Sequence, residues 1–171
     1  MRRYFRRHQP AVCRLTPWKA ATGGVAAIAL CALLAQLVGD PLLIAPLAAS
    51  AVLVFAAHDS PMAQPANVIG GHLLATIAAL AVAELLPPTW WAMALAVGLA
   101  IALMSLTRLT HPPAGADALV IVALHPGWSY LVFPIAIGSV LVVAAAVVVH
   151  RALPPRRVYP LPLPAKDGVG G

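Results

Sequence analysis

The side chains best suited to chemistry in this sequence lie in one short motif, residues 111–117, which read His-Pro-Pro-Ala-Gly-Ala-Asp. An imidazole and a carboxyl group can donate, accept or carry protons, and histidine does so near neutral pH. Two consecutive prolines cannot lie inside a continuous helix, because each lacks a backbone N–H and clashes with the preceding turn. We therefore expect a break at His111-Pro112 and a new helix near Pro113, where proline is favoured. The N-terminus of that helix offers free N–H groups and a positive dipole end to an anion or a polar solute.

The composition places this motif inside a membrane. Of 171 residues, 61% are hydrophobic and 9% are charged, and the mean hydropathy is +0.90. Soluble domains carry about 25% charged residues, so this chain has too little polar surface for water. Apolar runs cover residues 20–38, 41–57, 67–86, 88–107, 114–124 and 128–149. The chain is therefore expected to be an integral membrane protein of one domain.

The lengths of the runs separate them into two kinds. Four runs have 19 to 22 residues, enough to cross about 30 Å of hydrocarbon. Run 41–57 contains Pro41 and Pro46, and run 114–124 has only 11 residues, so neither spans alone as a helix. Irregular backbone at membrane depth needs a protein or aqueous environment. We predict an all-α polytopic membrane protein with four long transmembrane helices and two Pro-broken half-helices.

The two half-helices resemble each other. Residues 46–58 align without a gap to residues 113–125, with five of 13 positions identical and with Ser50 over Asp117. The alignment indicates an internal duplication. If each half-helix crosses the membrane together with its lead-in, the halves form an inverted 3+3 repeat, an architecture of transporters with a midplane site. The alternative is four true spans with two re-entrant loops.

The basic residues lie at the two ends of the chain. They are Arg2, Arg3, Arg6, Arg7, Arg14 and Lys19 before the first run, Arg151, Arg156, Arg157 and Lys166 after the last, and Arg108 alone between them. This positive-inside pattern predicts cytoplasmic termini, an even number of crossings and a bacterial-type inner (cell) membrane. The basic ends favour contact with anionic lipid over nucleic acid, because they flank membrane spans.

The domain organisation follows from the runs and the charges. We expect a basic cytoplasmic segment over residues 1–19, a membrane domain over 20–150 and a Pro/Gly-rich cytoplasmic tail over 151–171. Within the membrane domain, the two repeats cover about residues 20–86 and 88–149.

Asp117 is the strongest candidate for a functional side chain, because carboxylates inside membranes are rare and usually functional. We expect it to face a polar cavity and not lipid, where a charge at this depth is costly. Its alternative role is to stabilise the helix N-terminus. His111 is a candidate solute ligand, proton shuttle or purely structural cap, and Ser50 can instead bond its own backbone. The full candidate solute site comprises His111, Pro113, Gly115, Ala116, Asp117, Ser50, Ala49 and Arg108.

A second set of candidates lines the expected mouths of the path. These are His58, Ser60, Gln64, Asn67, His72 and His125. For Ser60 and Asn67 we favour a role as turn and helix-capping residues. The sequence offers no nucleophile–base pair, phosphate-binding loop or Cys/His metal spacing, so we expect no enzymatic activity, no cofactor and no metal.

Three motifs, in order, resemble those of the HPP family of small integral membrane proteins over about residues 18–150. Residues 111–116 match the namesake motif, and residues 60–72 and 127–134 are similar to the second and third signatures. The resemblance implies a four-helix-type membrane domain, and members in chloroplasts and cyanobacteria are associated with nitrite transport. Two positions depart from the family pattern: Asp117 replaces a residue that is usually neutral, and Ala66 one that is often basic.

The departure at Asp117 bears on the solute. A permanent carboxylate would repel nitrite. Either Asp117 is protonated, or it is paired with Arg108 or a cation, or the solute is not the anion. We expect a membrane transporter or channel for a small polar solute, foremost a small anion such as nitrite, working in the lipid bilayer as a homo-oligomer. The alternative is a non-transporting membrane module that binds a protein partner or lipid.

Overall fold

The computed structural model describes residues 11–39 and 45–162, and all regular structure within them is helical. Its helices are α1 (Leu15–Val38), α2 (Ala45–Ala56), α3 (Pro65–Leu85), α4 (Trp90–Leu106), α5 (Gly115–Leu124) and α6 (Ile137–Ala152). Short turns are the 3₁₀ turns η1 (Pro61–Ala63) and η2 (Pro112–Ala114) and the π-helical turn η3 (Leu131–Ala136), which runs directly into α6. The all-helical prediction is confirmed for these residues.

Three helices are long and apolar enough to cross a membrane: α1, α3 and the continuous segment Leu131–Ala152. The fourth expected span, residues 88–107, forms α4 with only 17 residues, or about 25 Å. It is shortened at its start because Thr89 acts as the N-cap after Pro87 and Pro88 and accepts a hydrogen bond from Ala92 N–H at 3.5 Å. The described residues thus contain three helices of spanning length, and α4 is a shorter apolar helix where a fourth span was expected.

The two half-helices form where the prolines predict them. α2 has 12 residues and α5 has 10. His111 has extended backbone, and the 3₁₀ turn η2 then leads into α5. α5 ends at His125, whose φ of 50° lies in the left-handed region. The lead-in to α2, with Pro41, lies outside the described residues.

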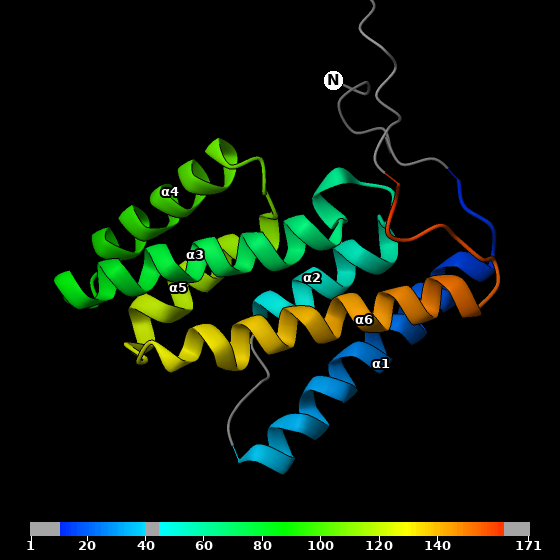
Figure 1. The fold of residues 1–171 in the computed structure, drawn as a ribbon, viewed down its shortest axis with the longest axis horizontal. Helices are drawn as coiled ribbons and strands as arrows, with labels where there is room; N and C mark the ends of the chain where they lie inside the picture. The colour runs from blue at the N-terminus through cyan, green and yellow to red at the C-terminus, as the bar shows by residue number, and fades with distance from the viewer. Residues whose placement is uncertain (1–10, 40–44, 163–171) are drawn as a thin grey trace, which may run out of the picture.

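The helices pack into two cores (Figure 1). The first core joins α1, α2 and α6, and the second joins α3, α4 and α5. In Figure 1, α3 and α6 cross the molecule in opposite directions, with α2 near the start of α3 and α5 toward its other end. Both cores are rich in alanine, which lets helices approach closely. Examples are Ala27, Ala51 and Ala146 in the first core and Ala79, Ala96 and Ala118 in the second.

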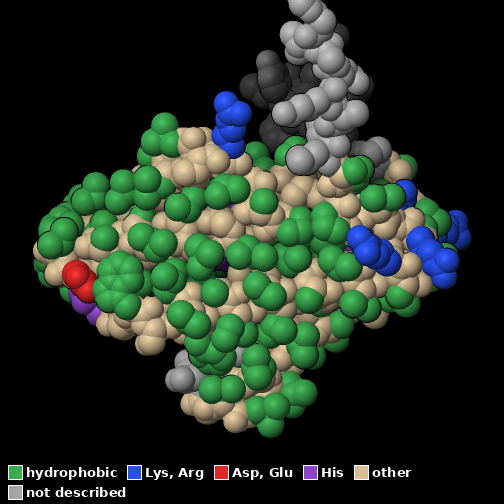
Figure 2. Space-filling model, viewed as in Figure 1, with side chains coloured by type: hydrophobic (Ala, Val, Ile, Leu, Met, Phe, Trp, Pro, Cys, Tyr) green, Lys and Arg blue, Asp and Glu red, His purple; other side chains and the backbone are tan. Residues whose placement is uncertain are grey.

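The start of α1 and the end of α6 lie together at one end of the molecule. Lys19 Nζ donates to Pro155 O at 2.8 Å, and the buried Tyr159 hydroxyl donates to Ala63 O at 2.9 Å. Several Lys and Arg side chains gather at this end, whereas hydrophobic side chains cover much of the visible face (Figure 2). This surface suits a protein surrounded by lipid.

Candidate functional site

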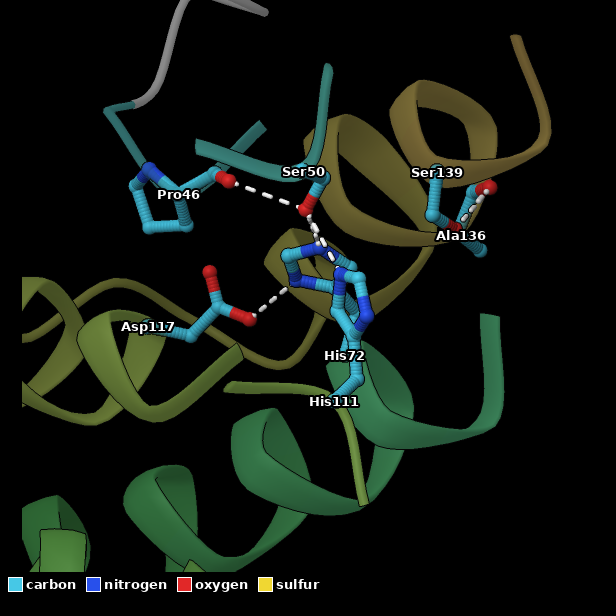
Figure 3. A network of polar contacts seen from close by, with 7 residues as sticks. All are labelled: Pro46, Ser50, His72, His111, Asp117, Ala136 and Ser139. Atoms are coloured by element: carbon cyan, nitrogen blue, oxygen red, sulfur yellow. Dashed lines mark hydrogen bonds and ion pairs between the residues drawn. The ribbon is translucent and has the colours of Figure 1, made fainter. Parts of the chain in front are cut away.

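One buried imidazole joins the two half-helices. His72 of α3 lies with its Nε2 2.7 Å from Ser50 Oγ of α2 and its Nδ1 2.6 Å from Asp117 Oδ2 of α5. Ser50 and Asp117 are the aligned polar residues, each four positions after the proline that begins its motif. Figure 3 shows the Ser50 hydroxyl and the Asp117 carboxyl reaching the imidazole group from different helices.

A second imidazole extends this contact into a chain of hydrogen bonds. His111 Nε2 lies 2.8 Å from Ser50 Oγ, and His111 Nδ1 lies 2.8 Å from Met62 O in the turn η1. Pro46 O, in the same helix as Ser50 and 3.0 Å away, is a second acceptor for the Ser50 hydroxyl, so the serine can also bond its own backbone, as the sequence allowed. Ser50, His72 and His111 are 0% exposed and Asp117 is 1% exposed. We call Ser50, His72, His111 and Asp117 the buried network.

Helix α3 holds the lead-in of α5 against this network. Asn67 Nδ2 donates to Thr110 O at 3.0 Å, and one turn later Gly71 lies against His111. A Cβ atom at Gly71 would lie 2.6 Å from His111 Cβ and 3.0 Å from Leu109 O, closer than atoms can pack. A glycine is therefore required for the backbone before α5 to reach α3 at this point.

Two buried oxygen atoms beside the network have no hydrogen-bond partner among the described residues. They are Asp117 Oδ1 and Thr76 Oγ1. Thr76 lies one turn after His72 on the same face of α3. An unpaired buried oxygen costs free energy, so this side of the network is suited to bind a donor from water or from a polar solute.

The structure brings together three of the residues expected to form the solute site: Ser50, His111 and Asp117. His72, which we grouped with the mouth, lies instead inside the core with them. Among the remaining candidates, Pro113, Gly115 and Ala116 are half-buried at the start of α5, whereas Ala49 and Arg108 are exposed.

Of the alternatives considered for Asp117, the pair with Arg108 does not form. Arg108 follows α4 with a φ of 60°, and its side chain is exposed. The partner of Asp117 is His72. The small residue Gly115 has nothing within 4 Å of an added Cβ, so close packing of helices does not require a glycine there.

The loop after α2 is held by its own polar side chains. Ser60 caps η1 and accepts a hydrogen bond from Met62 N–H at 3.2 Å, which confirms its capping role. Gln64 Nε2 donates to His58 O at 2.9 Å and to Ser60 O at 3.0 Å. Asn67 does not cap a helix but bonds the backbone ahead of η2, as described above.

The two histidines that end the half-helices lie apart from the network. His125 is the C-cap of α5, and its Nδ1 lies 3.0 Å from Val122 O. The ring of His58 stacks on that of His150 with centroids 4.7 Å apart. Burial lowers the pKa of His58, the positive charges of Arg157 and Lys19 add to this effect, and the nearby Asp59 opposes it.

Sequence reasoning did not identify Ser139, the residue of the second repeat that corresponds to His72 in the first. The alignment that places Ser50 over Asp117 also places Gly71 over Gly138, and therefore His72 over Ser139. Ser139 is fully buried but donates to Ala136 O of its own segment at 3.0 Å. The alignment itself was the available signal, since it marks α3 and α6 as equivalent helices.

Two surface cavities lie away from the buried network. One is an apolar groove between α1 and α2, and the other is lined by Thr16, Lys19, Phe55, His58, His150, Pro155 and Arg157. Asp117 lines neither of them, although we expected a carboxyl at this depth to face a polar cavity. In this conformation its surroundings are closed, because the His72 ring occupies the space next to the carboxyl. No group of His, Cys, Asp or Glu in the described ranges has the geometry to hold a metal ion.

These features define a helical integral membrane protein with a buried polar network between two half-helices. Residues 9–160 match the family described as HPP, transmembrane region, and the chain belongs to this family. It is 39% identical over 127 residues to one transmembrane protein of Dictyostelium discoideum, covering 70% of this chain and 40% of that protein. It is 38% identical over 156 residues to another from the same organism, covering 84% of this chain and 53% of that protein. The chain thus spans about half the length of these relatives or less, and no solved structure matches it.

Proposed function

We propose that this chain is a membrane transporter or channel for a small polar solute, and that the buried network lies on its path. The observation that carries the proposal is the meeting of Ser50 and Asp117, from two half-helices, on the single imidazole of His72. Ionisable side chains inside a membrane are costly and usually serve a solute or ion pathway. Helices broken at membrane depth are the usual frame of such sites.

The packing of the two cores supports an inverted 3+3 repeat. In the first core α1 and α2 pack with α6, which belongs to the other half, and in the second α4 and α5 pack with α3. The third helix of each half therefore packs in the core formed by the first two helices of the other half. Figure 1 is consistent with this exchange, since α3 and α6 run in opposite directions and α1 and α4 begin at opposite ends. On this proposal the shorter α4 is the fourth span.

Among polar solutes we propose a small anion such as nitrite. The N-termini of α2 and α5 both lie next to the buried network, and helix N-termini favour negative charge. The carboxyl of Asp117 does not oppose an anion on this proposal, because His72 and Asp117 together are neutral when they share one proton. The departure from the usual neutral residue is thereby compatible with an anionic solute.

The proposal extends to the setting of the protein. The basic residues at the joined ends of α1 and α6 favour a cytoplasmic location of both termini in a bacterial-type inner membrane. We propose a homo-oligomer in the bilayer, because the few helices of one membrane domain offer little protein around a solute path. The small residues Ala20, Gly24 and Ala48 in the groove between α1 and α2 would admit a neighbouring helix.

Solute flux into liposomes that contain the purified protein tests this function. Nitrite, nitrate, formate and chloride are compared, with protein-free liposomes as the baseline. The proposal expects saturable uptake of at least one of these anions above the baseline. If the protein inserts and folds but moves none of them, the alternative of a non-transporting module that binds a partner or lipid replaces it.

A further inference from the structure

The buried network has the geometry of a proton relay. We propose that Asp117, His72, Ser50 and His111 pass a proton back and forth between the carboxyl of Asp117 on α5 and the imidazole of His111 beside η1, and that this proton is coupled to the transported solute. The inference rests on the proposed transport function and names its coupling ion. It is carried by an uninterrupted series of contacts of 2.6 to 2.8 Å from Asp117 to Met62 O.

When both imidazole rings are neutral, the Met62 carbonyl sets the direction of the hydrogen bonds in the series. A carbonyl oxygen only accepts, so His111 Nδ1 carries a proton and donates to it. The neutral His111 ring then has an acceptor at Nε2, and the Ser50 hydroxyl donates to it in place of its other acceptor, Pro46 O. Ser50 Oγ in turn accepts from the Nε2–H of His72.

The same donor and acceptor assignment places a proton on Asp117. With its proton on Nε2, the neutral His72 ring has an acceptor at Nδ1, so Asp117 Oδ2 carries a proton and donates to it. The unpartnered Oδ1 atom fits this state, because leaving one oxygen of a neutral acid unpaired costs less than leaving a carboxylate oxygen unpaired. All four bonds thus point from Asp117 toward Met62.

A concerted shift of three protons moves charge along this series. The Oδ2–H bond of Asp117 breaks as His72 Nδ1 gains that proton. His72 Nε2 gives its proton to Ser50 Oγ, and Ser50 gives its original proton to His111 Nε2. The shift leaves a carboxylate at Asp117 and an imidazolium at His111, with His72 and Ser50 neutral and the number of protons unchanged. Between the two states the hydroxyl of Ser50 can turn toward Pro46 O, 3.0 Å away.

The unpartnered side of Asp117 is where the relay exchanges protons with its surroundings. Oδ1 is buried and has no partner among the described residues. On this proposal a protonated solute or a water molecule reaches the carboxyl there only when its surroundings, which are closed in this conformation, open. Among the neighbouring elements, Tyr130 before η3 is the further ionisable group within electrostatic range of Asp117. The sequences of α2 and α4 contain no ionisable residue, and those of α6 lie at its far end.

Proton movement into liposomes with a pH-sensitive dye inside tests the coupling. Wild type is expected to acidify or alkalinise the interior only when the transported solute is added. Asp117→Asn is expected to lose this proton movement, because an amide can bond His72 but cannot release a proton to it. Glu84→Gln is the matched control, since Glu84 is an exposed carboxyl that bonds Trp128 outside the network, and it should retain the coupling.

Two outcomes overturn the relay while leaving the transport function in place. They are solute uptake by wild type without proton movement, and proton movement by Asp117→Asn that equals that of wild type. If no solute is moved at all, the transport function fails, and infrared spectroscopy of the same samples still tests the relay. The relay predicts a protonated carboxyl band at neutral pH that is lost in Asp117→Asn and kept in Glu84→Gln, and its absence from wild type contradicts the relay.

Discussion

Ser50 and Asp117 occupy the same position in the two half-helices and bind opposite nitrogens of the His72 ring, at 2.7 Å and 2.6 Å. The contact ties α2, α3 and α5 together at a point where every participating side chain is buried. Because the same three residues also carry exchangeable protons, one set of contacts can serve both the stability of the fold and the handling of a solute. Substitutions that remove one contact at a time separate these two roles.

Removing the hydroxyl of Ser50 should destabilise the protein. Ser50→Ala leaves Nε2 of His72 and of His111 without their shared partner, and the unfolding free energy should fall by about 1–3 kcal/mol. Ser139→Ala is the matched control, because Ser139 bonds only a carbonyl of its own segment, and its effect should be near zero. Thermal unfolding in detergent measures both, and equal effects of the two changes would count against the network as a stabilising contact.

A methyl group at Gly71 should disturb the approach of the α5 lead-in. Gly71→Ala brings Cβ against the His111 Cβ and the Leu109 carbonyl, neither of which can move alone, so we expect a loss of about 1–3 kcal/mol. The matched control is Gly98→Ala in α4, where an added Cβ has nothing within 4 Å. The unfolding midpoints of the two variants are compared, and a Gly71→Ala protein as stable as Gly98→Ala would contradict this packing.

The stability of the protein should depend on pH through His58. Burial, together with Arg157 and Lys19, lowers the pKa of His58 in the folded protein, so below pH of about 6.5 the unfolded chain binds the proton more readily. This contribution to stability is present above that pH and is lost as the pH falls. His58→Gln removes it, and its unfolding midpoint should fall less than that of wild type between pH about 7.5 and about 5. Parallel curves for the two proteins would show that His58 contributes nothing to the pH dependence.

The two ends of the chain should react from the same side of the membrane. Cys13 is exposed before α1, and Cys31 is fully buried, so a membrane-impermeant maleimide should label Cys13 alone, and from the cytoplasmic side. In a Cys13→Ser background, Val158→Cys, at a position that is 66% exposed after α6, should be labelled from that side as well. Labelling of the two positions from opposite sides would mean an odd number of crossings.

Much of the helical framework could be predicted from the prolines and the apolar runs. The break at His111-Pro112 and the start of the half-helices near Pro46 and Pro113 follow from the geometry of proline. The equivalence of Ser50 and Asp117 also follows from the alignment of the two half-helices, although their meeting on one side chain does not.

Other features depend on contacts that sequence patterns do not encode. A histidine in an apolar run carries no sign of which helices surround it, so the central place of His72 needed the structure. Arg108 is exposed and has a left-handed backbone conformation after α4, and neither property can be read from a single arginine in the sequence. The length of α4 depends on a cap at Thr89 that interrupts an otherwise apolar run.

Uptake of nitrite and the other small anions by liposomes carrying wild type, Ser50→Ala or Ser139→Ala tests most directly whether the buried network lies on a solute path. Rates are compared per folded protein, so that any loss of stability does not count as loss of transport. If the network lies on the path, wild type and Ser139→Ala take up the anion and Ser50→Ala does not. Uptake by Ser50→Ala at the wild-type rate would show that the solute does not pass the network.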